Sequence, residues 1–550
     1  MEWHQVYAPL LGNIWLSALV ALLPIVLFFM SLIVFKLKGH IAAFLSVALS
    51  VLIAVGVYKM PMGMVGASFV YGFLYGLWPI AWIIIAAIFL YKLSVKSGYF
   101  EILKESVQSI TPDHRILVIL IGFCFGSFLE GAIGFGGPVA ITAAILVGLG
   151  LNPLYAAGLC LIANTAPVAF GAVGIPITAM AGAVGVSALA ISAMAGKILF
   201  FVSLLVPFFI VFLMDGVRGI KETFPAVFVA AFSFALAQYL SSNYLGPELP
   251  GILSAIVSLV STAIFLKFWQ PKHIFRSDGK EVAHTHQKHH ICKVFVAWAP
   301  FIILIITIVI WTQPWFKALF AKDGVFSFTS FAFEFESISN KILKSAPFLV
   351  EGKSATIPVI FKLPLINTVG TSIFVAAILS VFVLRVKPRE AASVFVETLK
   401  EMRYPILTIG LVLSFAFVSN YSGISATMAL ALTHTGKAFT FFSPIIGWIG
   451  VFLTGSDTSS NLLFGSLQQL TAGNLKIPEV LTLTANTVGG TLGKMISPQS
   501  IAIACAAVGL SGKESDLFKF TVKYSVIFVI LMGLAITVIA YGFPQIVPVV

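Results

Sequence analysis

Two acidic side chains stand alone in long apolar stretches of the sequence. Between Arg115 and Asp215 the only Asp, Glu, Lys or Arg residues are Glu130 and Lys197, and Asp457 interrupts a second apolar stretch. A carboxylate at membrane depth costs about 2.5–3.5 kcal/mol on insertion scales, so such a residue is expected to have a function. Both acids are therefore candidates for carrying a proton across a membrane.

The neighbours of the two acids suggest different roles. Glu130 has Gly and Phe neighbours, which offer a carboxylate no obvious partner, and it is the first candidate for proton coupling. Asp457 lies in the run GSDTSSN, whose hydroxyl groups favour a binding or orienting role. Capping of a helix near the membrane surface is the alternative role for Asp457. Within the same run, Ser456 and Ser459 are candidates for substrate binding.

Paired Asn-Thr elements are further candidates for substrate binding. Asn164-Thr165 and Asn486-Thr487 each follow an alanine and precede a Gly- and Pro-containing turn. Their amide and hydroxyl groups would suit a carboxylate and a hydroxyl, with helix N-termini adding a positive dipole end. The alternative is that each pair only caps a helix break. Lys494 follows the second pair, and would bind a substrate carboxylate, pair with Asp457, or extend to the membrane interface.

Clustered glycine and proline predict broken helices around these side chains. Broken helices at membrane depth survive only inside protein or along a watery cavity, and transporters bind substrates at such breaks. The predicted break residues are Gly131, Gly134, Gly136, Gly137, Pro138, Pro176 and Pro498.

The second half of the chain repeats the first. Asn164 precedes Pro176 by the same number of residues as Asn486 precedes Pro498, and Trp78-Pro79 is echoed by Tyr404-Pro405. The helix containing Pro79 runs toward a basic segment, whereas the helix containing Pro405 begins at one. Since basic loops face the cytoplasm, equivalent helices run in opposite directions, and the repeats have inverted topology.

Composition fixes the class of protein. Of the 550 residues, 59% are hydrophobic and only 10% are charged, which indicates a polytopic membrane protein. We expect an all-α fold of about 12–16 transmembrane or half-membrane helices in two inverted-topology repeats with broken helices and re-entrant hairpins.

The chain is predicted to divide at the basic, His-rich loop 267–293. The first half, 1–293, holds N-terminal spans, the first repeat at about 60–215 and linking spans. The second half, 294–550, holds further spans, a long extracytoplasmic segment at 313–365 and the second repeat at about 387–545. The basic loops place the N-terminus outside, on the same face as 313–365.

Several function classes are excluded or disfavoured. The net charge of +12 sits in short loops, where it sets orientation and contacts membrane lipid, so no nucleic-acid partner is expected. The spans contain no His-x-x-x-His, paired-Cys or Gly-x-Ser-x-Gly arrangement, so we predict no enzyme, no cofactor and no metal site. The tract 281–293 is a metal-binding tract or, more simply, a solvated loop.

Long stretches of the sequence resemble the bacterial L-lactate permease family across nearly the whole chain. They are YGFLYGLWPIAWIII, GFCFGSFLEGAIGFGGPVAITAA, CLIANTAPVAFGAVGIPI, FLTGSDTSSNLLFGSL and GKMISPQSIAIACAAVG. The Asn-Thr pairs are also similar to the hairpin tips of a wider ion-transporter superfamily that includes divalent-anion:sodium symporters.

The resemblance implies uptake of lactate, glycolate and related 2-hydroxy acids with protons across the bacterial cytoplasmic (inner) membrane. It also implies scaffold and transport domains, elevator-like movement and a homodimer. Sodium coupling, or exchange of another small organic anion, is the alternative that the residues leave open.

Overall fold

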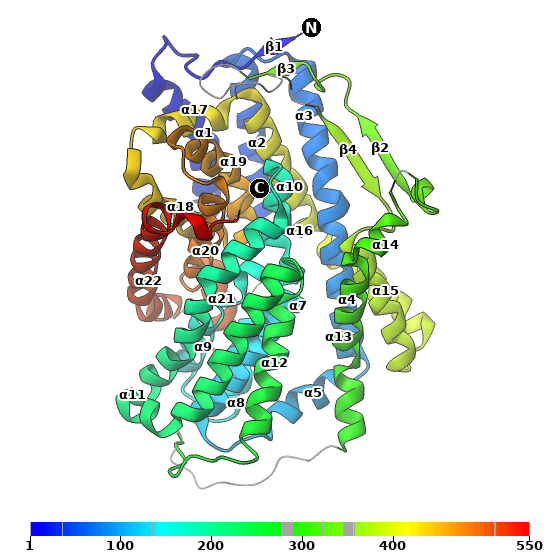
Figure 1. Cartoon of the computed structure of the whole chain (residues 1–550), viewed down its shortest axis with the longest axis vertical. Coiled ribbons are helices and arrows are strands. Elements are labelled where there is room, and N and C mark those ends of the chain that lie inside the picture. Colours follow the sequence, from blue (N-terminus) through cyan, green and yellow to red (C-terminus); the bar gives the residue numbers. More distant parts are fainter. Residues whose placement is uncertain are drawn as a thin grey trace.

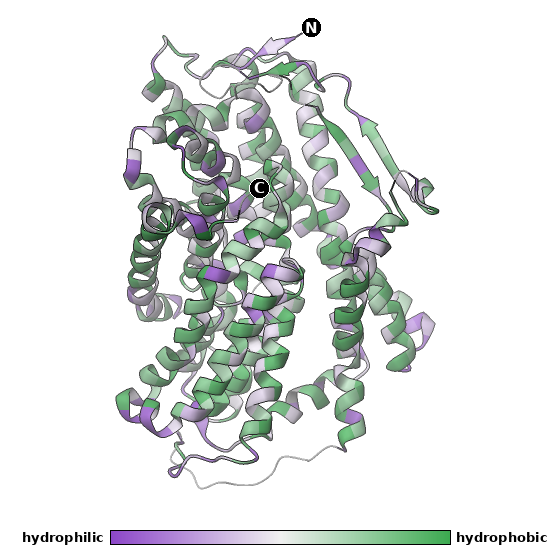
Figure 2. Cartoon of the chain, viewed as in Figure 1, coloured by the Kyte–Doolittle hydropathy of each residue, from purple (hydrophilic) through white to green (hydrophobic). Residues whose placement is uncertain are grey.

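The computed structural model describes residues 2–35, 37–134, 137–276, 290–321, 323–344, 356, 358–510 and 513–548. Within these ranges eight helices are long and apolar enough to cross a membrane, and a further pair, Pro153–Ala163 and Val168–Val184, is bent by 65° at a break. Shorter apolar helices lie alongside them (Figure 1). Hydrophobic residues dominate the long helices (Figure 2). These features confirm the predicted polytopic helical fold with broken helices.

The first repeat is a series of helices interrupted by short irregular turns. The start of α9 is set by its sequence. Asn152 accepts hydrogen bonds from the Leu154 and Tyr155 N–H groups, and Pro153 takes the first helical position. The elements are α3 (Met62–Tyr75), η1 (Gly76–Ala81), α4 (Trp82–Lys96), α5 (Tyr99–Gln108), α6 (His114–Val118), η2 (Ile119–Phe125), α7 (Gly126–Ala132), α8 (Gly137–Gly148), α9 (Pro153–Ala163), η3 (Val168–Phe170), α10 (Gly171–Val184) and the first part of α11 (Ala188–Tyr244).

The second repeat has the same order with longer uninterrupted helices. Its elements are α16 (Pro388–Ser422), α17 (Ile424–Thr433), η5 (Gly436–Ala438), α18 (Phe439–Thr454), α19 (Asp457–Leu475), α20 (Glu479–Lys494), α21 (Pro498–Ala507) and α22 (Glu514–Gly542).

Equivalent helices of the two repeats pack antiparallel. Ser414 donates a hydrogen bond to Phe69 O near one end of the contact, and Lys92 forms ion pairs with Glu397 and Glu401 at the other. Residue numbers therefore rise along α3–α4 while those of their partners fall along α16. Glycines allow the close approach, since a Cβ at Gly72 would lie 2.6 Å from Leu413 O. This is the inverted topology that the charge pattern predicts.

Outside the repeats, further helices pack against both halves, and short strands build one end of the molecule. Strand β1 pairs with β3, so the N-terminus lies on the same face as the segment predicted outside, and Figure 1 places β2 and β4 at that end as well. The elements are β1 (Trp3–His4), α1 (Ile14–Ile33), α2 (Gly39–Gly56), α12 (Pro250–Phe265), α13 (Ile291–Thr312), α14 (Pro314–Ala318), η4 (Ser327–Thr329), β2 (Ser330–Glu334), β3 (Ile342–Leu343), β4 (Ile360–Pro364), α15 (Val369–Val383) and η6 (Pro544–Ile546).

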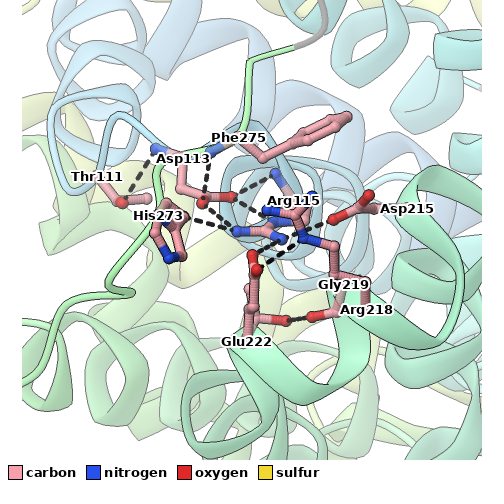
Figure 3. Close-up of polar contacts among 10 residues, drawn as sticks. Thr111, Asp113, Arg115, Asp215, Arg218, Gly219, Glu222, His273 and Phe275 are labelled. Atoms are coloured by element: carbon pink, nitrogen blue, oxygen red, sulfur yellow. Dashed lines mark hydrogen bonds and ion pairs between the residues drawn. The ribbon is translucent and has the colours of Figure 1, made fainter.

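A buried arginine joins three segments at the predicted cytoplasmic end (Figure 3). The Arg115 guanidinium forms ion pairs with Asp113 at 2.8 Å, Asp215 at 2.7 Å and Glu222 at 2.8 Å. It also donates to His273 O, in the segment that follows α12. One cation thus compensates acids from the start of α6 and from the kink of α11, and holds the beginning of the loop that leads to α13.

Two sequence predictions fall partly outside the described residues. Gly136 lies outside the described residues, and so do residues 281–289 of the His-rich tract 281–293. The division of the chain at residue 293 stays a prediction.

The antiparallel packing predicts that Pro61 and Pro388 face opposite sides of the membrane, because they lie at the starts of α3 and α16, which run in opposite directions. Single cysteines placed beside each proline, in a background without native cysteines, should react with an impermeant thiol reagent from opposite sides. Labelling of both from one side would contradict inverted topology.

Replacing Arg115 with Met should destabilise the protein, because three acids would then face one another without their cation. Removing one partner of a buried ion pair costs about 3–5 kcal/mol, and we expect the lower end because Asp215 and Glu222 keep 19% and 21% of their side chains exposed. Thermal unfolding in detergent measures the loss. Arg218→Met is the matched control, since it removes a largely exposed partner of the same Glu222 and should change little.

Candidate substrate and coupling site

Glu130 is buried near the end of α7. Its Oε2 accepts a hydrogen bond of 3.2 Å from Asn164 Nδ2 at the end of α9, so two candidates from separate helices are in contact. A Cβ at Gly171 would lie 3.0 Å from Glu130 Oε1. The absence of a side chain at Gly171 therefore leaves room for the carboxyl.

The backbone is broken on both sides of this carboxyl. Helix α7 ends at Ala132 and Gly134 takes a positive φ of 61°, which agrees with the predicted break. The second break lies at Ala172, Val173 and Gly174, whose φ values are 44°, 58° and 73°, just before the predicted Pro176. A β-branched residue such as Val173 is rarely found with positive φ, and strain of this kind often marks functional sites.

The other predicted break residues frame the same region. Gly131 packs closely against α12, since a Cβ there would lie 2.6 Å from the Gly251 carbonyl carbon. Gly137 and Pro138 begin α8 after the first break, and Pro498 begins α21 in the second repeat.

Asp457 begins α19 and is buried. Its Oδ2 accepts a hydrogen bond of 2.9 Å from Thr487 Oγ1 on α20, whereas Oδ1 has no partner among the described residues. Gly490 faces Oδ1, and a Cβ there would collide with it. Ser456 is the N-cap of α19 and accepts from the Ser459 N–H at 3.2 Å, so both serines support the helix start that presents Asp457.

Lys494 joins the two acids into one electrostatic cluster. It is buried in the last turn of α20, and its Nζ donates to Gly455 O at 3.0 Å. The ammonium attracts both Glu130 and Asp457, which repel each other. No carboxylate within the described ranges forms an ion pair with Lys494 at 4.0 Å or less, so two of its three N–H donors stay available.

The two Asn-Thr pairs differ in what their side chains contact. Asn164 Oδ1 has no partner among the described residues, whereas the Asn486 amide accepts from Gln468 Nε2 at 3.1 Å and donates to Asn461 Oδ1 at 2.9 Å. Thr165, just beyond the end of α9, donates to Ile162 O in that helix. The substrate-binding roles of all these residues stay predictions.

The analysis of the sequence missed Asn461 and Gln468. A signal for them exists, because Asp457, Asn461 and Gln468 follow one another at helical spacing and so share one face of α19. Two surface grooves, one lined by residues that include His40 and the other by residues that include Phe232, contain none of the predicted site residues. The site is therefore defined by buried polar contacts between helices.

Inverted repeats of membrane helices that meet at buried ionisable side chains and broken helices are typical of membrane transporters. The family model described as L-lactate permease matches residues 17–543, and the chain belongs to this family.

Its relatives match along almost their whole length. The chain is 54% identical to the L-lactate permease of Escherichia coli strain K12, over 99% of this chain and 100% of the relative. It is 53% identical to the glycolate permease GlcA of the same strain, over 99% of each chain. It is 49% identical to the L-lactate permease of Bacillus subtilis strain 168, over 97% of each chain. The protein is thus a multi-pass protein of the bacterial inner membrane.

The different contacts of Asn164 and Asn486 predict different effects on folding. Asn486→Ala removes two buried hydrogen bonds, one from Gln468 Nε2 and one to Asn461 Oδ1. Leaving a buried polar group without its partner costs about 1–3 kcal/mol. Asn164→Ala removes a single contact with Glu130 and is the matched control. Thermal unfolding of both purified variants should show the larger loss for Asn486→Ala, and equal losses would contradict the asymmetry.

Proposed function

We propose that this protein takes up L-lactate and related 2-hydroxy monocarboxylates, such as glycolate, together with protons. The names of the relatives support the substrate class. We further propose an alternating-access mechanism, with elevator-like movement of the broken helices against the antiparallel pair α3–α4 and α16. The homodimer that the resemblance implies stays a prediction.

The charge of the buried cluster is the observation that carries this proposal. With Glu130, Asp457 and Lys494 all ionised, the cluster has an excess of negative charge. A monocarboxylate that binds beside it adds another negative charge, which is unfavourable in a region shielded from water. Protonation of one carboxyl removes that penalty, so binding of the anion and binding of a proton favour each other.

The membrane potential also favours transport of the anion together with a proton. Moving an anion into a cell whose interior is negative costs about 2.3 kcal/mol per 100 mV. A proton that travels with the anion cancels this charge. The pH gradient and the substrate gradient are then left to drive uptake.

We assign roles from the contacts of each side chain. Among the described residues the Lys494 ammonium donates only to Gly455 O, and its remaining N–H donors bind the substrate carboxylate. The Asn164 amide, which contacts Glu130, binds the same carboxylate. Glu130 carries the proton, because the only side-chain hydrogen-bond partner of its carboxyl among the described residues is the Asn164 amide. Asp457 is held by Thr487 and orients the substrate.

Replacing Glu130 with Gln tests the proton role. Gln imitates the protonated carboxyl permanently, so accumulation driven by a pH gradient should be abolished in proteoliposomes. Exchange of internal for external lactate should persist, since exchange needs no net release of protons. Radiolabelled uptake and counterflow measure the two activities.

Glu390 is an exposed acid on α16, and the variant Glu390→Gln is the control, which should keep both activities. Continued accumulation by Glu130→Gln would assign the proton to another group, with Asp457 the first to examine. Accumulation by the unmodified protein on an imposed sodium gradient alone would favour sodium coupling instead.

A further inference from the structure

A chain of hydrogen bonds through fully buried side chains ends at Asp457. Every donor in it points the same way, from α18 through α19 and α20 toward the carboxylate. Ser443 Oγ donates to Gln468 Oε1 at 2.7 Å, Gln468 Nε2 to Asn486 Oδ1 at 3.1 Å, Asn486 Nδ2 to Asn461 Oδ1 at 2.9 Å, Asn461 Nδ2 to Thr487 Oγ1, and Thr487 Oγ1 to Asp457 Oδ2 at 2.9 Å.

Two backbone carbonyls fix this direction. Gln468 Nε2 also donates to Ser443 O at 2.9 Å, and Asn461 Nδ2 also donates to Pro176 O at 3.0 Å. A carbonyl oxygen only accepts, so neither amide can be turned around without losing a bond. Asn486 lies between these two amides and takes its orientation from them. The last donor, Thr487, must therefore present its O–H to Asp457.

The chain leaves Asp457 with one occupied and one free oxygen. Oδ2 is held by Thr487, and Oδ1 is buried, without a partner among the described residues, and faces Gly490. Lys494 lies one helical turn beyond Gly490 on α20, so its ammonium shares a face of this helix with the space that Gly490 leaves. An acceptor for a hydroxyl and a donor for a carboxylate are thus close together.

We propose that Asp457 Oδ1 accepts the hydrogen bond of the substrate's 2-hydroxyl while Lys494 binds its carboxylate, and that Asn461 and Gln468 are positioning residues that hold Asp457 for this contact. The inference rests on the proposed transport of 2-hydroxy acids and extends it to the source of selectivity. A 2-oxo acid has no hydrogen to donate to Oδ1. Its carbonyl oxygen would face the carboxylate oxygen and be repelled.

The ratio of two apparent affinities measures this selectivity. Lactate and pyruvate have the same charge and nearly the same size, so changes in overall charge or folding affect both alike. Unlabelled lactate or pyruvate competes with labelled lactate in counterflow, which needs no ion gradient. Since a hydrogen bond to a charged group is worth about a 10–100-fold change in affinity, the unmodified protein should prefer lactate by that factor.

Asp457→Asn should reverse the preference or abolish it. Thr487 donates its O–H, so the amide oxygen takes the place of Oδ2 and the amide nitrogen takes the place of Oδ1. The substrate then meets a donor instead of an acceptor, which suits the carbonyl of pyruvate. An unchanged ratio of lactate to pyruvate affinity in this variant would overturn the proposal.

Variants of two neighbouring glutamines on α19 test whether the hydrogen-bond chain positions Asp457 or only contributes to packing. Gln468→Leu breaks the chain, whereas Gln469→Leu removes contacts of the same kind, since Gln469 donates to Val184 O and to Glu479 outside the chain. We expect Gln468→Leu to lower the lactate preference several-fold and Gln469→Leu to leave it unchanged. Equal effects of both variants would assign the chain to packing alone.

The two proposals can fail separately. If the unmodified protein exchanges no lactate, the proposed function fails. If it exchanges lactate but shows no preference over pyruvate, only the role of Asp457 fails. If it prefers lactate but a pH gradient drives no accumulation, only the proton coupling fails.

Discussion

The energetic cost of a charge buried within the membrane governs the centre of this protein. Glu130, Asp457 and Lys494 are all buried, and no two of them form a close ion pair among the described contacts. They interact at longer range, and each also has a hydrogen-bond partner from a neighbouring helix. Such an arrangement tolerates a change of charge, because no strong pair has to be broken when a proton or an anion arrives.

Glycines provide the space that these side chains need. In the first repeat Gly171 stands beside Glu130, and in the second Gly490 stands beside Asp457. A Cβ at Gly490 would collide with the Asp457 carboxyl, and a Cβ at Gly171 would lie 3.0 Å from that of Glu130, so each glycine leaves room for its acid. The same requirement explains why the helices are broken here, since irregular backbone lets two helices approach a polar side chain from different directions.

The two inverted repeats have related folds, but their polar side chains make different contacts. The first repeat uses its break in α10 to expose Pro176 O, and Asn461 of the second repeat binds that oxygen. In the second repeat both the oxygen and the nitrogen of the Asn486 amide form hydrogen bonds within the repeat. In the first repeat the Asn164 Oδ1 has no partner among the described residues. One half is thus more suited to change its contacts, and the other to hold a fixed geometry.

Much of the architecture was determined by the sequence itself. Long apolar runs require membrane-spanning helices, and the order of basic loops requires that the helices containing Pro79 and Pro405 run oppositely. The isolation of Glu130 and Asp457 in apolar sequence marked them as candidate functional residues, since an acid at membrane depth is costly. Glycine after Glu130 predicted the break that the structure places at Ile133 and Gly134.

Only the tertiary structure decided how the polar side chains are paired. Asn164 and Asn486 have the same neighbours in sequence, yet one contacts an acid and the other two amides, because different helices pack against them. The direction of the hydrogen-bond chain depends on backbone carbonyls contributed by α10 and α18. Periodicity and composition describe one segment at a time, whereas a hydrogen bond across helices is set by how those segments pack together.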